Sequence, residues 1–333
     1  MRRLLLLFLL LCSPVAWAEV SVLTSIKPLQ LIAAAVQDGV ALPQVLLPAG
    51  ASPHHFALRP SDIRRVQEAQ LLYWIGPEME TFLPRVLRQR SQPTVAVKDL
   101  PAVQLRYFGE TAAAAPEPVG HAHAHDHDHS PGTLDAHLWL SPVNAKLMAA
   151  KMAADLAVLD PANAARYQRN LQAFEQRVDA LNMRLLSSLA GIQDKPYFVF
   201  HETYAYFEAA YGLTHAGVFS LSSEAQPGAR RVAQMREELQ LAGPTCVFSE
   251  PPLRPRLAQT LSAGLPVQLA ELDALGSAIE VSAQGYEQLL QGLADAMLTC
   301  LRKVEQDGRT KAPTAGAGDA GAAAGVARPP PAP

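Results

Sequence analysis

Short β-rich runs alternate with helical stretches along most of this chain, and that alternation limits the folds open to it. A strand pattern at residues 20–26 is followed by a helical pattern at 29–36, and the same alternation restarts after Gly191. Strands separated by helical crossovers predict a mainly parallel sheet. The expected strands are residues 20–26, 44–47, 71–75, 94–97, 138–140, 197–200, 217–220, 245–249 and 267–270. The expected helices are 29–36, 61–69, 143–159, 203–211, 230–241, 254–263 and 286–304. We therefore expect an α/β protein of two lobes, each with a mainly parallel sheet flanked by helices.

One long helix separates the two series of strands. Asp160-Pro161 has the pattern of a helix start, and apolar residues then recur every three or four positions to about residue 189. The stripe consists of Tyr167, Leu171, Phe174, Val178, Leu181 and Leu185. At 1.5 Å per residue this helix spans roughly 45 Å, enough to contact both lobes. The expected layout is an N-terminal lobe at 19–159, a linking helix at 160–190 and a C-terminal lobe at 191–305.

The first eighteen residues predict export. Arg2 and Arg3 precede a short apolar run at 4–11, and Ala16-Trp17-Ala18 resembles a cleavage site. The alternatives are an N-terminal core helix or a lipid anchor on Cys12. Cleavage after residue 18 takes the formal charge from −3 to −5 because it removes two arginines. A mildly acidic exported chain suits cations and argues against a nucleic-acid partner.

Two cysteines, Cys246 and Cys300, remain after cleavage. An even pair in an oxidising compartment predicts a disulfide, and two separate buried thiols are the alternative. The disulfide would close a loop of about 54 residues, which the chain-entropy argument equates with roughly 4 kcal/mol of stability.

A polar segment at residues 108–133 interrupts the alternation and holds half of the chain's ten histidines. They stand at every second position: His121, His123, His125, His127 and His129. The segment is rich in Ala, Pro, Gly and Asp, so we expect a disordered surface loop, and a second disordered segment in the tail at 306–333. Imidazole and carboxylate side chains are ligands for zinc-like cations. The loop is therefore an expected auxiliary metal site; the alternative is a solvated linker that binds metal incidentally.

Four further polar residues stand next to predicted strands. His54 lies in the loop after 44–47, His137 begins the expected strand at 138–140, His201 follows 197–200, and Asp273 follows 267–270. Ligands of open α/β sheets bind beyond the carboxyl ends of the strands. These four residues could thus converge between the lobes.

Four sequence motifs, in order, resemble those of the zinc-uptake binding proteins, the periplasmic substrate-binding components of ATP-driven metal importers. The motifs are residues 47–62 (with Pro53-His54-His55), 135–142, 200–204 and 246–251, and the resemblance covers about residues 19–302. It implies two α/β lobes joined by one long helix, a Zn²⁺ ion between them, a histidine-rich acidic loop near the entrance, a membrane permease partner and a periplasmic location. We also expect a monomer and no enzymatic activity.

Carried over by motif, the zinc ligands are His54, His137 and His201, with Asp273 near the metal. Some members of the family have a Glu before the first histidine, where this chain has Pro53. The fourth ligand therefore stays open between Asp273, water and a loop histidine. The adjacent His55 is expected to be a bystander, because neighbouring residues of an extended segment point apart.

The third ligand position also bears on the choice of metal. Manganese-binding relatives use a carboxylate there, so His201 favours zinc, although Glu202 lies beside it.

Two other functions fit part of the pattern. An exported zinc hydrolase also uses three histidines and an open fourth position, with Glu202 or Glu250 as candidate base. However, the sequence contains no His-Glu-x-x-His pair and no Gly-x-Ser-x-Gly elbow. A soluble metal buffer would use the loop histidines as its main site and would not need the strand-end residues.

Overall fold

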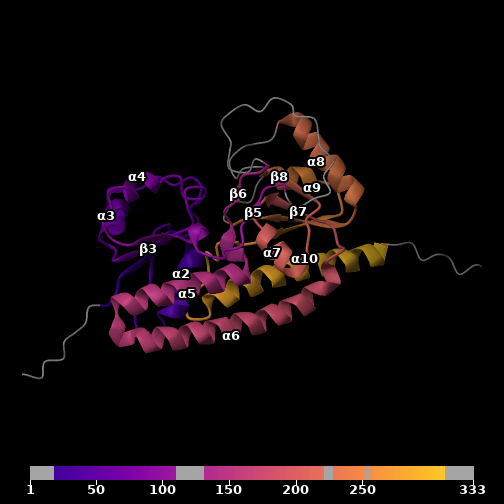
Figure 1. Ribbon diagram of the computed structural model, residues 1–333. Coiled ribbons are helices and arrows are strands. Elements are labelled where there is room, and N and C mark those ends of the chain that lie inside the picture. The colour runs from indigo at the N-terminus through magenta and orange to yellow at the C-terminus, as the bar shows by residue number, and fades with distance from the viewer. Residues whose placement is uncertain (1–18, 110–130, 221–227, 252–255, 312–333) are drawn as a thin grey trace, which may run out of the picture.

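The computed structural model describes residues 19–109, 131–220, 228–251 and 256–311, and in it the chain forms two α/β lobes above a layer of long helices (Figure 1). The signal-like segment, the histidines at 121–129 and the tail beyond 311 lie outside the described residues. None of the described helices is both long enough and apolar enough to span a membrane.

The first lobe contains a four-stranded parallel sheet of order β2-β1-β3-β4. Its strands are β1 (Val22–Thr24), β2 (Gln44–Val45), β3 (Leu71–Trp74) and β4 (Thr94–Ala96). The connections contain the helices α2 (Lys27–Val36), α3 (Pro60–Glu68) and α4 (Pro84–Leu87), and the 3-10 turn η1 (Val97–Asp99) follows β4. Helix α2 is buried over nearly all of its surface because it packs on β1 and also contacts three long helices of the lower layer.

The second lobe repeats this plan with a parallel sheet of order β10-β9-β7-β8. Its strands are β7 (Tyr197–His201), β8 (Gly217–Ser220), β9 (Thr245–Ser249) and β10 (Val267–Glu271). Its helices are α7 (Ala205–Tyr211), α8 (Ala229–Ala242), α9 (Arg256–Ser262) and α10 (Gly285–Lys311). The predicted alternation is therefore confirmed in both lobes.

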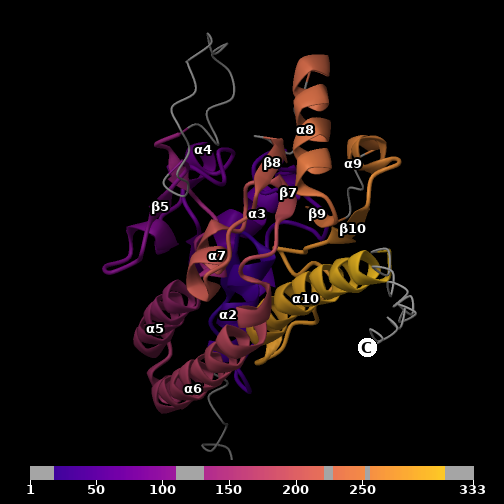
Figure 2. The same cartoon turned by 90° about the vertical axis from the view of Figure 1, so that its right-hand side faces the viewer.

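Three long helices form the layer beneath the lobes: α5 (Pro142–Leu159), α6 (Ala164–Leu189) and α10 (Figures 1 and 2). The apolar stripe predicted for α6 is buried along its whole length, and it continues to Leu189. Polar side chains add to this packing. Asn170 of α6 donates to the Val36 carbonyl at 2.8 Å, and Arg177 of α6 pairs with Glu287 of α10. The long helix thus contacts elements of both lobes, as a linking helix should.

The start of the long helix differs from expectation. Asp160-Pro161 opens the 3-10 turn η3 (Pro161–Asn163), and α6 begins only at Ala164. The Asp160 carboxylate accepts hydrogen bonds from the Asn163 and Tyr167 side chains, which favours the tighter turn. A further 3-10 turn, η4 (Ala190–Ile192), follows α6.

The last helix, α10, continues to Lys311, beyond the expected boundary at 304 and into the segment expected to be a disordered tail. The expected end followed the last apolar position, Val304. An ion pair between Glu305 and Lys195, at 2.7 Å, fastens the next turn of the helix to the turn after α6.

Residues 138–140 also differ from expectation, because they form the 3-10 turn η2 (Leu138–Leu140) and not a strand. The nearby strand is β6 (Leu134–Asp135), which pairs antiparallel with β5 (Arg106–Tyr107). All three side chains of η2 are fully buried, and a short buried run has no periodicity that separates strand from helix.

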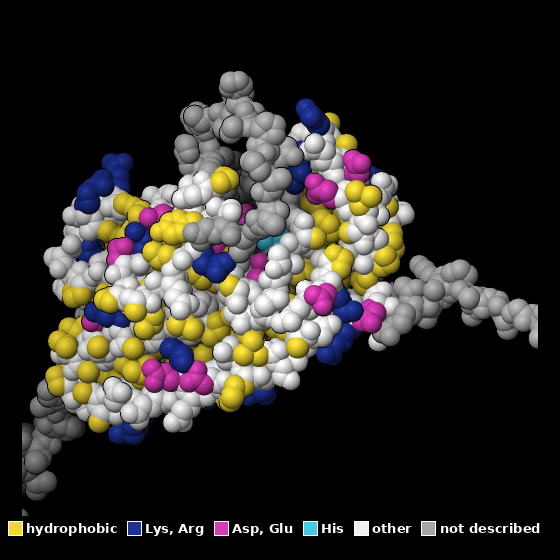
Figure 3. Space-filling model, turned by 45° about the vertical axis from the view of Figure 1, so that its right-hand side comes forward, with side chains coloured by type: hydrophobic (Ala, Val, Ile, Leu, Met, Phe, Trp, Pro, Cys, Tyr) yellow, Lys and Arg dark blue, Asp and Glu magenta, His cyan; other side chains and the backbone are white. Residues whose placement is uncertain are grey.

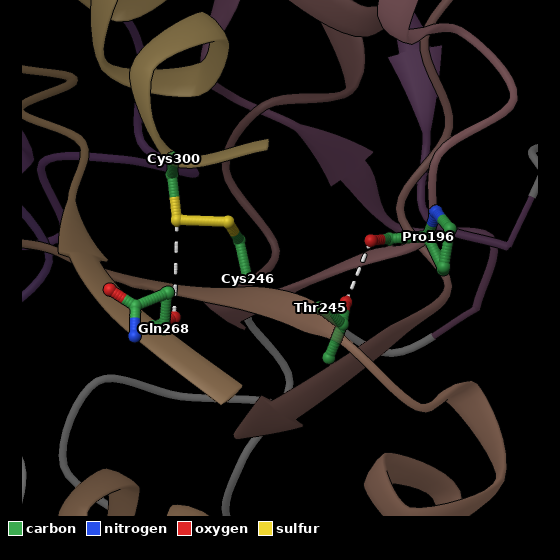
Figure 4. Close-up of a disulfide and its surroundings, with 5 residues drawn as sticks. All are labelled: Pro196, Thr245, Cys246, Gln268 and Cys300. Carbon is green, nitrogen blue, oxygen red and sulfur yellow. Dashed lines mark hydrogen bonds between the residues drawn. A yellow bond between two sulfur atoms is a disulfide. The ribbon is translucent and has the colours of Figure 1, made fainter. Parts of the chain in front are cut away.

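The disulfide expected between Cys246 and Cys300 is present and joins β9 to α10 (Figure 4). Both cysteines are buried, and the Cys246 strand is held further by Thr245, which donates to the Pro196 carbonyl at 2.7 Å. The bond therefore fastens the final helix to the sheet of the second lobe.

Candidate metal centre

The three strand-end histidines meet between the lobes. His54 lies in the loop after β2, His137 follows β6, and His201 is the last residue of β7. Each can offer a ring nitrogen such that the three nitrogens lie within 4.8 Å of one another, and the ring centroids are 5.6 Å apart in every pair. All three are at least 93% buried, and the face in Figure 3 shows only a small area of histidine surface. Residues distant in sequence thus form one compact imidazole cluster.

Asp135 fixes the orientation of His137. One carboxylate oxygen accepts from the His137 backbone N–H at 3.0 Å and lies 2.7 Å from its Nδ1. Because an ionised carboxylate only accepts, Nδ1 carries the proton and Nε2 keeps a lone pair. Both side chains are almost completely buried. Such a carboxylate–imidazole pair presents Nε2 for metal binding.

A longer chain of hydrogen bonds orients His201. Its Nδ1 lies 2.8 Å from the Thr203 hydroxyl, and that hydroxyl donates to Glu250 at 2.6 Å. Since the hydroxyl proton is directed at Glu250, the hydroxyl oxygen accepts from Nδ1–H, which again leaves Nε2 for a ligand. Thr203 and Glu250 thereby do for His201 what Asp135 does for His137.

The contacts between His201 and Glu250 shift the pKa of both side chains. Burial lowers the pKa of His201, but the charge and hydrogen bond of Glu250 outweigh it, so the pKa lies above its ordinary value. Burial conversely raises the pKa of Glu250, and the interaction with His201 outweighs it, so that pKa lies below its ordinary value. Glu250 is therefore ionised at neutral pH beside the cluster.

His54 is positioned through its backbone. The Thr81 hydroxyl donates to the His54 carbonyl at 3.3 Å, and Thr81 follows the fully buried Glu80. The Glu80 carboxylate accepts from the Ser25 hydroxyl and from the Gly76 N–H, the latter at 3.0 Å, and burial raises the pKa of Glu80 to about 7. This buried carboxylate ties the end of β1 to the turn after β3, and so supports the loop that carries His54.

A cavity of about 110 Å³ lies at the cluster, lined by residues of both lobes. In tetrahedral Zn²⁺ coordination the metal–nitrogen distance is about 2.0–2.1 Å, so two ligand nitrogens lie roughly 3.4 Å apart. Small rotations of the three side chains would bring their nitrogens from the observed spacing to this distance. Three imidazole nitrogens and one open position suit a Zn²⁺-like cation. The space suits a single ion better than an organic substrate.

The other sequence-predicted site residues are placed differently. His55 is exposed, with its ring centroid 6.4 Å from that of His54. The Asp273 carboxylate accepts from the backbone N–H groups of Leu275 and Ser277, at 3.1 and 2.7 Å. Asp273 is absent from the cluster of candidate ligands among the described residues, and so is Glu202. The structure therefore brings together His54, His137 and His201, and engages Asp273 in its own turn.

Sequence reasoning missed the support that Thr203, Glu250 and Glu80 give to the histidines. Thr203 and Glu250 stand inside two of the quoted motifs, yet the sequence suggests for Glu250 only the role of a base in hydrolysis. The buried acid Glu80 had no signal in the sequence, because one of its partners, Ser25, lies 55 residues away in the chain.

The lobes are also linked by direct hydrogen bonds near the cluster. The Trp139 indole donates to the Ala274 carbonyl at 2.8 Å, and the Tyr286 hydroxyl donates to the Trp139 carbonyl at 2.8 Å. These bonds connect the residues after His137 with the loop that follows β10 and with α10. The cluster is therefore enclosed by an arrangement that depends on contact between the lobes.

Comparison with known proteins places these features in a family. The chain matches the family described as "Zinc-uptake complex component A periplasmic" over residues 22–300. It is 39% identical over 302 residues to the high-affinity zinc uptake system protein ZnuA of Yersinia pestis, covering 88% of this chain and 95% of that protein. It is 35% identical over 315 residues to the protein of the same name from Brucella suis, covering 87% and 94%.

Solved structures share the fold. The Mn²⁺ complex of the protein FpvC from Pseudomonas aeruginosa matches with a TM-score of 0.70 at 22% identity, over 86% of this chain and 99% of that one. A crystal structure of ZnuA matches with a TM-score of 0.68 at 22% identity, over 84% and 99%. At this identity the likeness concerns the two-lobed architecture alone.

Proposed function

This chain belongs to the family of periplasmic component A proteins of zinc-uptake complexes, and we propose that it captures Zn²⁺ between its lobes and delivers it to a membrane permease. The observation that carries the proposal is the buried cluster of His54, His137 and His201 at the lobe interface. The function is that of an extracytoplasmic substrate-binding protein, and zinc is its cargo.

The donor set supports zinc as the metal. Imidazole nitrogen suits zinc, whereas manganese favours carboxylate and other oxygen ligands. The ionised Glu250 lies behind His201, where it stabilises positive charge at the cluster without serving as one of its three candidate ligands. We assign His54, His137 and His201 as the protein ligands, with water, Asp273 or a loop histidine in the fourth position.

Asp273 would have to leave its present hydrogen bonds to reach the metal. Its two oxygens accept from Leu275 and Ser277, so binding an ion would cost both bonds. Water is therefore the preferred fourth ligand in this arrangement. A bound water can be replaced without reorganising the loop, which suits a protein that must also release its cargo.

Capture and release would follow from the position of the site. A buried ion between two lobes can leave only when the lobes or their loops separate, and the bonds of Trp139 to Ala274 and of Tyr286 to Trp139 would then break. A permease that binds the separated form better would shift the equilibrium toward release. The partner is an ABC-type permease, the location is the periplasm, and the protein acts as a monomer without enzymatic activity.

The histidines at 121–129 would serve as an auxiliary collector. Several imidazoles close together raise the chance of capture, and the interleaved aspartates attract cations. Binding an ion there would cost conformational entropy of the segment. We therefore expect these sites to bind zinc more weakly than the cluster.

A calorimetric titration with zinc, manganese and copper tests the proposal. Wild type should bind one zinc tightly and manganese much more weakly, and the His54→Ala and His201→Ala variants should each lose tight zinc binding. The matched control is His55→Ala, which removes the neighbouring exposed imidazole and should leave the tight constant unchanged. Equal damage from His55→Ala and His54→Ala would refute the ligand assignment, and hydrolysis of ester or peptide substrates that depends on zinc would favour the hydrolase alternative.

A further inference from the structure

His137 is bonded to the second lobe through residues on both sides of it in sequence. The bonds of Trp139 with the Ala274 carbonyl and with Tyr286 hold the residues that follow it. A separate bond holds the residue two positions before it, because the Tyr206 hydroxyl donates to a backbone carbonyl there at 2.9 Å. Tyr206 belongs to α7, and Figure 1 shows β5 and β6 beside this helix. The segment that carries His137 is therefore fastened to a helix of the second lobe.

The Tyr206 hydroxyl bridges the two strands on which this segment rests. It accepts a hydrogen bond from the Arg106 backbone N–H at 2.8 Å and donates to the Asp135 carbonyl. Arg106 of β5 and Asp135 of β6 stand opposite each other in the antiparallel pairing. Burial and the nearby Asp135 carboxylate raise the pKa of Tyr206, so the hydroxyl keeps its proton and can donate. One buried hydroxyl thus joins both strands to α7.

Holding the Asp135 carbonyl also affects the Asp135 side chain. The peptide unit is planar, so a bond to the carbonyl sets the plane of the link from Asp135 to the next residue, and with it the backbone of Asp135. The Asp135 carboxylate in turn accepts from the His137 backbone N–H and lies 2.7 Å from His137 Nδ1. The Tyr206 hydroxyl therefore acts on the His137 ring through the carboxylate that orients it.

The position of Tyr206 is itself set by the end of β7. Helix α7 begins four residues after His201, the last residue of that strand. In the short connection between them the Thr203 hydroxyl lies 2.8 Å from His201 Nδ1. Helix α7 also packs on η2, the turn that begins directly after His137. Because Tyr206 is placed relative to His201, its bond fixes the spacing between the two histidines.

We propose that Tyr206 is a positioning residue for zinc binding, whose hydroxyl holds His137 at the spacing from His201 that one metal ion requires. This proposal rests on the zinc function proposed above. Binding to ligands that are already in place costs less ordering entropy than binding to ligands that must first be brought together. A protein that populates the competent arrangement only in part has an affinity reduced by that fraction. Loss of the hydroxyl should therefore weaken zinc binding and speed zinc dissociation, although all three histidines remain.

The test is Tyr206→Phe in the full-length mature protein, because it removes the hydroxyl and keeps the ring. We expect the zinc dissociation constant to rise about three- to tenfold in competition with a chelator, the factor that corresponds to one uncharged hydrogen bond. Zinc transfer to excess chelator, followed in time, should accelerate by a similar factor. With Co²⁺ as the probe, the visible absorption spectrum of the variant should differ from that of wild type, because it reports coordination geometry. A loss of stability alone would leave the spectrum unchanged.

Two other buried tyrosines supply matched controls. The Tyr211 hydroxyl, also on α7, has no hydrogen-bond partner among the residues that the structure describes. The Tyr197 hydroxyl donates to Glu208 at 2.6 Å, and this bond lies within the second lobe. Tyr211→Phe should leave zinc binding unchanged. Tyr197→Phe should lower the melting temperature of the zinc-free protein without changing the zinc constant, which separates lost stability from lost positioning.

A double-mutant cycle identifies the route from the hydroxyl to the metal. Asp135→Ala removes the carboxylate that connects the bridge to the His137 ring. If Tyr206 acts through that carboxylate, Tyr206→Phe should cost less zinc affinity in the Asp135→Ala background than in wild type. Two independent effects would instead multiply.

A second measurement needs no substitution and decides the matter if Tyr206→Phe does not fold. Zinc that joins His137 to His201 should in return strengthen the bridge. The Arg106 amide, which donates to the Tyr206 hydroxyl, should therefore exchange its hydrogen with solvent more slowly in zinc-loaded than in zinc-free wild type.

Four outcomes would overturn the proposal. They are wild-type zinc affinity and dissociation in Tyr206→Phe, an equal loss of affinity in Tyr197→Phe, the same cost of Tyr206→Phe in the Asp135→Ala background as in wild type, and Arg106 amide exchange that does not respond to zinc. Failure of the zinc function itself would be recognised separately, because wild type would then bind no zinc tightly or His54→Ala would bind it as tightly as wild type.

Discussion

Replacing Asp135 by Asn should weaken zinc binding about tenfold while leaving the fold intact. The substitution keeps the size of the side chain and lets the amide oxygen accept from His137, but it removes the negative charge. In the structure that charge lies 2.7 Å from His137 Nδ1, and both side chains are at least 96% buried. The surrounding solvent therefore screens little of the interaction.

The magnitude follows from the difference between two kinds of hydrogen bond. A bond to a charged group contributes about 1.5–3 kcal/mol, and a neutral bond about 0.5–1.5 kcal/mol. The variant should thus lose roughly 1–2 kcal/mol of the interaction that orients the ring and supports its partial positive charge when metal binds. This corresponds to an affinity loss of about 5- to 30-fold, close to the range typical of carboxylates behind metal-bound histidines.

The assay is competition with a zinc chelator at neutral pH, with thermal melting of the zinc-free proteins as a check on folding. Asp38→Asn is the matched control, because it removes the same charge from an exposed position after α2. If Asp135→Asn binds zinc as tightly as wild type, Asp135 does not position His137 and the assigned tautomer is wrong. If Asp135→Asn lost as much zinc affinity as His137→Ala, Asp135 would do more than orient the His137 ring.

Three further predictions concern pH, the disulfide and the histidine loop. Protons compete with metal for imidazole. Burial lowers the pKa of His201 but Glu250 raises it further, so zinc affinity should begin to fall above the ordinary imidazole value of about 6.5 and continue falling to about pH 5. Glu250→Gln should move this onset to lower pH, and an unchanged profile in chelator competition would contradict the assigned cause. Replacing Cys246 and Cys300 by Ser opens a loop of 54 residues and should lower the free energy of unfolding by about 4 kcal/mol, measured by urea denaturation of the zinc-free protein. Deleting residues 121–129 should lower the number of zinc ions bound and leave the tightest constant unchanged in calorimetry; loss of the tight site would instead indicate a direct ligand within that segment.

Local sequence patterns predicted most of the secondary structure because they depend on near neighbours. The stripe from Tyr167 to Leu185 is a property of one helix, and it was sufficient to predict α6 and its buried face. Prediction was weaker where the local sequence fits both a strand and a helix, or where a distant residue fixes the end of an element. Residues 138–140 are buried on every side and so carry no periodicity, and the end of α10 involves an ion pair with the distant Lys195.

The candidate metal site was likewise predictable from the sequence only in part. Its three histidines could be named from the sequence because each lies beside a strand or within a recognisable motif, and parallel sheets bring strand ends together. The surroundings of these histidines could not be predicted. Glu250 reaches His201 through Thr203 only because β9 lies beside β7, and Asp273 turns toward the backbone of its own loop.

The sequence by itself determined the two-lobed α/β plan, the linking helix, the pairing of the two cysteines and the identity of the clustered histidines. Each of these follows from residue periodicity, from composition or from a short motif. Only the tertiary structure decided which acids orient the imidazoles and that Asp273 stands apart from them. Glu250, for example, reaches Thr203 across 47 residues of sequence, and such contacts are set by how the lobes and helices pack.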